Sequence, residues 1–216
     1  MRRSSGFVLG ALLIVAAGVW AGPLAGPGDD GVVPAPAEGQ GTIDRPGRFL
    51  WRYLGPRLEV IVDTRHAQSD LGRTWVILNV AISGEQGKSV EIPRKGVFLE
   101  TPDGTRVGIP DPQEFASRFG EISAAARRAM VAADPLDFAR AGRRPCSLAF
   151  QPLPQQGVAA DSVWVNVRRI CTGFLYFPLG HTVEPGTYHL VIELEDGTTI
   201  RVPFTLGSEE APPPTR

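Results

Sequence analysis

Apolar and polar residues alternate along most of the chain after residue 48, and this alternation predicts β-strands. The clearest case is residues 185–206, in which two alternating segments flank an Asp-Gly pair. Because side chains of a strand point to opposite faces in turn, each segment has one apolar face. Asp-Gly between two such segments is typical of a β-hairpin. The apolar faces of the two arms contain Tyr188, Leu190, Ile192, Leu194, Ile200, Val202 and Phe204.

Further segments with the same period predict the strands against which this hairpin packs, since an isolated hairpin is marginally stable in water. Residues 74–83 are apolar on both faces, which is typical of a central strand covered on each side. Thr-Pro-Asp-Gly at residues 101–104 predicts a type I turn between two short strands. About nine short strands with turn residues between them predict an antiparallel β-sandwich. The other predicted strands lie near residues 49–53, 58–63, 89–92, 97–100, 105–109, 146–151, 163–167 and 174–177.

Residues 111–142 interrupt the strand pattern and predict two helices. Asp111 is a suitable N-cap, followed by proline at the first helical position and glutamate at the third. An apolar stripe at three- and four-residue steps then predicts a helix to about residue 132. Asp134-Pro135 repeats the start signal, and Gly142 can end a short second helix. We expect this helical insertion to cover an open edge or end of the sheet. The stripe consists of Phe115, Phe119, Ile122, Ala126 and Met130.

The two ends of the chain differ from its middle. Residues 1–21 predict an export signal, because Arg2 and Arg3 precede an apolar segment at residues 7–19. We expect cleavage after Ala21; the alternative is an uncleaved anchor. Residues 22–47 are rich in proline and glycine and predict a disordered linker, and residues 208–216 predict a disordered tail. The β-sandwich domain is therefore expected at residues 48–207.

Export places the two cysteines, Cys146 and Cys171, in an oxidising compartment, either the periplasm or the extracellular space. Antiparallel pairing of the flanking strands around a loop centred near Gly157 places Cys146 opposite residue 168, close to Cys171. We therefore expect a structural disulfide between them, with Cα atoms within about 7 Å.

Two stretches support a family resemblance. Residues 75–107 contain a long hydrophobic strand, a short strand and then Phe-Leu-Glu-Thr-Pro-Asp-Gly. This order is similar to telokin-like, immunoglobulin-like domains of exported bacterial proteins. Gly186-Thr187-Tyr188 resembles the Gly-x-Tyr corner of immunoglobulin-like sandwiches, in which the tyrosine hydroxyl bonds back to the main chain. The cysteines do not occupy the antibody positions, and the helical insertion is extra. The resemblance implies a fold and transfers no catalytic residue.

Motifs for catalysis are absent from the sequence. It contains no Gly-x-Ser-x-Gly, no His-Glu-x-x-His and no phosphate-binding glycine loop. The three histidines, His66, His181 and His189, are expected to be solvated, and His189 to face away from the core. Asp134 with Asp137, and Glu193 with Glu195, are expected to be structural or solvated rather than acid–base pairs. We expect no catalytic residue, no metal site and no cofactor.

Net charge argues against a nucleic-acid partner. The formal charge is −1, and without the export signal 20 basic residues face 23 acidic ones. The strongest candidate for a binding surface is the run from Arg168 and Arg169 to Phe174 and Tyr176, because arginine and aromatic residues are enriched at recognition hot spots. The alternative is that these aromatic residues belong to the core.

Three functions follow as hypotheses. The first is an exported, non-enzymatic module of the bacterial cell envelope that binds a protein partner or assists an assembly, with no membrane span in the mature chain. The second is a carbohydrate-binding module that uses exposed aromatic rings, and the third is a hydrolase with an unrecognised site. Exposed coplanar rings would favour sugar, a contiguous apolar patch would favour protein, and perturbed carboxylates in a cleft would favour a hydrolase. The candidate rings are Trp51, Tyr53, Trp164 and Tyr176.

Overall fold

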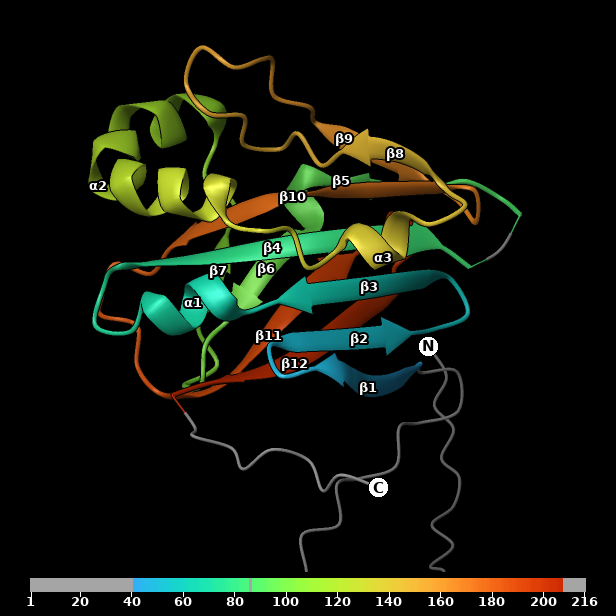
Figure 1. The fold of residues 1–216 in the computed structure, drawn as a ribbon, viewed down its shortest axis with the longest axis horizontal. Coiled ribbons are helices and arrows are strands. Elements are labelled where there is room, and N and C mark those ends of the chain that lie inside the picture. Colours follow the sequence, from blue (N-terminus) through green and yellow to red (C-terminus); the bar gives the residue numbers. More distant parts are fainter. Residues whose placement is uncertain (1–40, 86, 208–216) are drawn as a thin grey trace, which may run out of the picture. The chain divides into compact units, whose positions relative to one another are not determined.

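β-Strands are the predominant regular structure in the part of the chain that the structure describes, and they form three sheets (Figure 1). The structure is a computed structural model, and it describes residues 41–85 and 87–207. The predicted signal at residues 1–21, most of the predicted linker and the predicted tail at residues 208–216 lie outside the described residues. The protein is mainly β, with several antiparallel sheets, as the alternating pattern predicts.

The largest sheet has six strands in the order β1-β2-β3-β4-β10-β8. Neighbours run antiparallel except at one edge, where β8 runs parallel to β10. β4 is buried along its whole length, as its two apolar faces predict. The strands are β1 (Thr42–Gly47), β2 (Leu50–Leu54), β3 (Leu58–Asp63), β4 (Trp75–Gly84), β8 (Arg144–Ser147) and β10 (Arg169–Pro178).

A four-stranded sheet contains the predicted hairpin, formed by β11 (Gly186–Glu193) and β12 (Thr199–Leu206). Its order is β12-β11-β6-β7, with β6 (Val97–Glu100) and β7 (Arg106–Gly108) joined by the predicted turn. In that turn the Gly104 amide donates to the Thr101 carbonyl at 2.9 Å. All seven predicted inward-facing hairpin residues are buried.

A third, two-stranded sheet pairs β5 (Val90–Pro93) with β9 (Ser162–Val165), and the 3₁₀-helix η1 (Arg94–Gly96) follows β5. Side chains from all three sheets meet in one apolar core cluster. Tyr188 of β11 is fully buried there and stacks on Phe204 of β12, with 5.8 Å between ring centroids. Its hydroxyl donates to the Glu184 carbonyl at 2.8 Å, which is the main-chain bond that the Gly-x-Tyr corner predicts.

The helices α2 (Pro112–Val131) and α3 (Asp137–Arg140) lie on the face of the six-stranded sheet that is opposite this core, whereas α1 (Arg65–Ser69) contributes the buried Ala67 to the core itself. The Asp111 side chain accepts hydrogen bonds from the Gln113 and Glu114 amides at 2.9 and 2.8 Å, so the predicted N-cap is confirmed.

The predicted helices cover one face of the sheet, and α2 does so at the end where β4 begins and where β10 extends beyond its pairing with β8. Phe115 and Ile122 of α2 pack on Trp75 and Tyr176 of the sheet, and α3 covers a smaller apolar cluster. β4 and β10 carry large apolar side chains on both faces, so the second face also needs a cover. Met130 is the member of the predicted stripe that departs from this packing, since it is 45% exposed.

The predicted linker also needs correction at its end, since residues 42–47 form β1. This strand pairs with β2, with Thr42 opposite Leu54, and the Arg52 guanidinium donates to the Asp44 carboxylate at 2.9 Å. Pro46 is tolerated because β1 is an edge strand. Proline lacks an N–H, and at an edge this absence removes no hydrogen bond from a neighbouring strand. The sequence rule that proline and glycine mark linkers misses such an edge.

The predicted disulfide is present, but the strand pairing that predicted it is wrong. Cys146 and Cys171 are direct partners in the parallel register of β8 and β10, with 4.4 Å between their Cα atoms. β9, which was expected to pair with β8, pairs with β5 instead. A parallel pair needs a crossover of a dozen or more residues, and the segment between Ser147 and Arg169 is long enough to supply one. β9 ends at Val165, so Val167 leaves the predicted strand and is 44% exposed.

Candidate functional site

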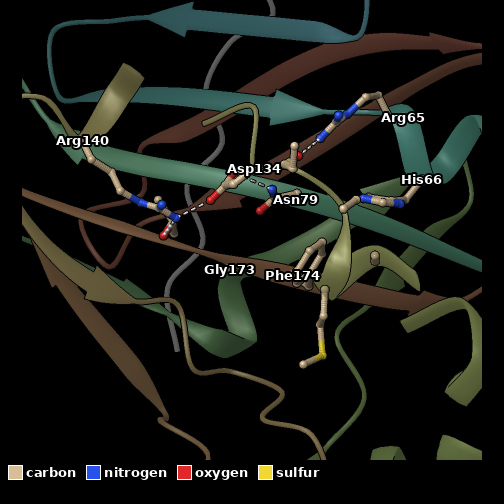
Figure 2. A pocket seen from close by; sticks show the side chains of 12 residues that line it. Arg65, His66, Asn79, Asp134, Arg140, Gly173 and Phe174 are labelled. Carbon is tan, nitrogen blue, oxygen red and sulfur yellow. Dashed lines mark hydrogen bonds and ion pairs between the residues drawn. The ribbon is translucent and has the colours of Figure 1, made fainter. Parts of the chain in front are cut away.

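A groove of about 190 Å³ lies where the end of α2 meets the six-stranded sheet (Figure 2). β4 and β10 form part of its wall, α1 contributes two side chains, and the segment from α2 to α3 contributes the rest. Gly173 allows a close approach of this wall to Leu148, since a Cβ there would lie 3.0 Å from the Leu148 side chain. Side chains and main chain of Arg65, His66, Asn79, Met130, Asp134, Arg140, Thr172 and Phe174 line it, among others.

Asp134 is the centre of the polar side of the groove. Its Oδ1 accepts from Asn79 Nδ2 at 3.2 Å and from the Leu136 amide at 2.9 Å. Its Oδ2 accepts from Arg140 Nη2 at 2.6 Å, and the same nitrogen donates to Thr172 Oγ1 at 2.8 Å. Asp134 therefore has the predicted structural role, and it holds the start of α3 against β4 and β10.

Two further arginines fasten the segment between α2 and β8 to the sheet. Arg65 Nη2 donates to the Ala133 carbonyl at 2.9 Å, and Arg65 also pairs with the buried Asp63 at 3.1 Å. Arg143 Nη1 donates to Glu59 Oε2 at 2.6 Å and to Ser83 Oγ at 3.0 Å. The groove is therefore bordered by a segment that is anchored to β3 and β4 by charge-assisted hydrogen bonds.

His66 is partly buried in the groove, so the expectation of a solvated side chain is wrong there. Its ring meets Phe174 edge to face, with 5.8 Å between centroids. Burial lowers the pKa of His66, while the nearby Asp63 carboxylate acts in the opposite direction. Burial of the imidazole therefore favours its neutral form. Figure 2 shows His66 and Arg65 on one side of the groove and Arg140 on the other, with Asn79 and Asp134 between them.

The other two histidines lie away from the groove. His181 is exposed, as expected. His189 faces away from the core, as expected, and lies on the outer side of the four-stranded sheet, 3.9 Å from Glu100. Burial and Arg201 lower the pKa of His189, and Glu100 acts in the opposite direction. Neither histidine contributes to the groove.

The structure separates the four residues of the predicted binding run. Phe174 lines the groove, whereas Tyr176 is 2% exposed beneath α2. Arg168 and Arg169 are exposed at the start of β10. Arg169 and Phe174 are five residues apart in a strand, which corresponds to about 17 Å. The run is therefore divided between the groove, the core and a distant surface.

Three of the four candidate sugar-stacking rings are buried or partly buried. Tyr53 and Tyr176 are buried, and Trp51 is partly buried with the Arg45 guanidinium 4.5 Å above its ring. Trp164 is 48% exposed. The four rings thus supply one exposed platform and no coplanar exposed pair.

A second cavity of about 260 Å³ lies between the loop that follows α1, the start of β4 and the middle of α2, and no sequence pattern predicts it. Asp70 lines it and is 3% exposed, and its Oδ2 has no hydrogen-bond partner among the described residues. Burial raises the pKa of the Asp70 carboxyl to about 6, although Arg73 acts in the opposite direction. Glu121 lines the same cavity and accepts from Trp75 Nε1 at 2.7 Å.

Comparison with known proteins does not assign this chain to a family. No family model, no curated protein and no solved structure matches the chain. Within residues 41–85 and 87–207, no group of three or more His, Cys, Asp or Glu side chains could hold a metal ion. None of the helices in the same part of the chain is long and apolar enough to cross a membrane.

Proposed function

We propose that this chain is an exported, non-enzymatic, immunoglobulin-like protein of the bacterial cell envelope, and that it binds a protein partner at the groove beside α2. The mainly β fold, the Tyr188 hydroxyl bond and the Cys146–Cys171 disulfide support the fold and the compartment. Disulfides persist in oxidising compartments such as the periplasm.

Exposed apolar side chains at the end of α2, and on α3, whose Arg140 lines the groove, carry the proposal. Met130 lines the groove and is 45% exposed, and the adjacent Val131 is 86% exposed. Phe138 of α3 is 48% exposed, two residues before Arg140. Methionine, aromatic residues and arginine are enriched at protein–protein interfaces. We refer to Met130, Val131, Phe138 and Arg140 as the α2–α3 surface.

The polar groups of the groove support binding rather than chemistry. Asp134 and Arg140 are engaged with each other and with the sheet, and His66 packs on Phe174. Such mutual hydrogen bonds hold a surface in one geometry before a partner arrives, and this lowers the entropic cost of binding.

One observation favours a hydrolase as the second candidate function. Asp70 and Glu121 line one cavity, and their surroundings move their pKa values apart. Burial raises the pKa of Asp70 to about 6. Hydrogen bonds from Arg118 and Trp75 lower the pKa of Glu121. Opposite shifts of this kind are typical of acid–base pairs. A hydrolase would lose its activity in Asp70→Asn, whereas the binding function would persist.

Affinity capture from envelope extract tests the proposal. The full exported chain carries Phe138→Asp, and the matched control carries Val158→Asp at a residue that is 90% exposed in a different loop. We expect a discrete protein to be captured by wild type and by the control, and to be lost with Phe138→Asp. Both variants should keep the wild-type melting temperature, because both residues are exposed. Equal capture by all three proteins would contradict the role of the α2–α3 surface.

A further inference from the structure

Three exposed arginines gather at the start of β10, in a chain whose arginines mostly have carboxylate partners. Arg144, Arg168 and Arg169 are exposed, and none of them has an ion pair within the described part of the chain. By contrast, Arg143 pairs with Glu59 at 2.6 Å and Arg57 pairs with Asp196 at 2.6 Å. We refer to Arg144, Arg168, Arg169 and the intervening Val167 as the arginine tip.

A tight turn fixes the arginine tip. The Arg169 amide donates to the Asn166 carbonyl at 3.0 Å, and the Asn166 amide donates back at 3.4 Å. Val167 and Arg168 thus stand at the apex. Asn166 Oδ1 also accepts from the Arg168 amide at 3.0 Å, and Asn166 Nδ2 donates to Ser89 Oγ at 3.2 Å.

The neighbouring strand adds the third arginine. The Arg144 amide donates to the Arg168 carbonyl at 2.7 Å, and Arg144 is the register partner of Arg169. The disulfide between Cys146 and Cys171 lies two residues further along the same two strands. Like charges in direct cross-strand positions destabilise a sheet. Here the disulfide keeps the strands of Arg144 and Arg169 together. Neither arginine forms an ion pair with a carboxylate in the described part of the chain.

Main-chain pairing with a partner strand is disfavoured at this edge. The Arg144 amide donates to the Arg168 carbonyl just before β10 at 2.7 Å, and the Leu148 amide donates to the Thr172 carbonyl in β10 at 2.8 Å. Since main-chain groups in a strand alternate in direction, the main-chain groups of Pro145 and Ser147 face away from β10. Pro145 has no N–H, and proline at an outward position protects an edge from strand addition. A partner at the arginine tip is therefore recognised by side chains rather than by main-chain hydrogen bonds.

We propose that the arginine tip binds an acidic segment of a protein partner. A guanidinium pairs with a carboxylate through two parallel hydrogen bonds, and three arginines carried by one fixed turn and its neighbouring strand fit several carboxylates in sequence. Val167, which is 44% exposed at the apex, offers an apolar contact between them. This inference rests on the proposed function, because it takes the partner to be a protein, but it concerns a surface separate from the α2–α3 surface.

Fluorescence anisotropy with a labelled glutamate-rich peptide tests the inference on the full exported chain. We expect binding that weakens steeply as salt rises, and that falls on the order of tenfold in Arg168→Ala/Arg169→Ala. The control is Arg127→Ala/Arg128→Ala, an adjacent pair on α2 that is equally exposed and makes the same change in net charge. The control should bind like wild type.

Any of three results would overturn the inference: no binding of the peptide by wild type, an equal loss of affinity in both double variants, or binding of anionic lipid vesicles in place of the peptide. Capture from envelope extract separates this inference from the proposed function. If Arg168→Ala/Arg169→Ala still captures the partner that Phe138→Asp loses, the arginine tip is wrong and the α2–α3 surface stands. If the tip variant loses peptide binding while Phe138→Asp captures the partner like wild type, the α2–α3 surface is wrong and the arginine tip stands.

Discussion

Replacing Asp70 by asparagine should change how the stability of this protein depends on pH. Burial raises the pKa of Asp70 from 3.8 to about 6 in the folded state. The folded state therefore holds this proton more tightly than the unfolded chain does between these pH values. Because stability falls with rising pH wherever the folded state binds more protons, wild type should lose stability from about pH 4 to about pH 6 and then level off.

The size of this effect follows from the same pKa. A rise from 3.8 to about 6 corresponds to about 3 kcal/mol over the whole titration, of which about 2 kcal/mol falls between pH 4 and pH 7. Asp70→Asn removes this titration, while any cost of burying the amide is independent of pH. The change in unfolding free energy between pH 4 and pH 7 should thus differ by about 2 kcal/mol between variant and wild type, with the variant favoured at pH 7.

Urea denaturation followed by tryptophan fluorescence measures this difference, with the disulfide kept oxidised at every pH. Asp161→Asn is the control, since the Asp161 side chain is 97% exposed, and it should follow the wild-type profile. Parallel profiles for wild type and Asp70→Asn would show that the predicted titration does not occur. They would mean that the unpaired Oδ2 of Asp70 is solvated or paired in solution.

Three further substitutions test the fold. Asp111→Ala removes both hydrogen bonds at the start of α2 and should lower the free energy of unfolding by about 1 kcal/mol, measured by urea denaturation. Cys146→Ser/Cys171→Ser opens a disulfide that spans 25 residues and should lower it by about 3 kcal/mol, whereas wild type after reduction should match the variant. Tyr188→Phe keeps the stacking on Phe204 but leaves the Glu184 carbonyl without its donor, and should cost about 1 kcal/mol in the same assay.

Local features of the fold could be predicted from the sequence because local residues determine them. The hairpin of β11 and β12 follows from period-two alternation around Asp-Gly, and the start of α2 follows from the capping property of Asp111. The two apolar faces of β4 predicted a strand covered on both sides, and the structure shows it.

Long-range features could not be predicted in this way. β8 pairs parallel with β10, and nothing in its four residues distinguishes this from an antiparallel pair. The disulfide was predicted despite this error because either pairing brings Cys146 near Cys171. β1 was missed because its proline and glycine content is tolerated at an edge.

The residues of the groove also divide into those that the sequence predicted and those that only the tertiary fold reveals. Phe174 was predicted as a contact because it is aromatic, and it lines the groove. Asn79 and His66 come from β4 and α1, and only the tertiary fold brings them to Asp134 and Phe174. The exposed position of Met130 could not be predicted either, since the helical period assigns it to the buried stripe.

Site-specific photo-crosslinking in intact cells can show whether the α2–α3 surface contacts a protein partner, as we propose. A photoreactive amino acid replaces Phe138 in one strain and Val158, the more exposed of the two residues, in another. We expect one discrete crosslinked product from position 138 and none of that size from position 158. The absence of a product at position 138, or the same product at both positions, would contradict the proposed contact.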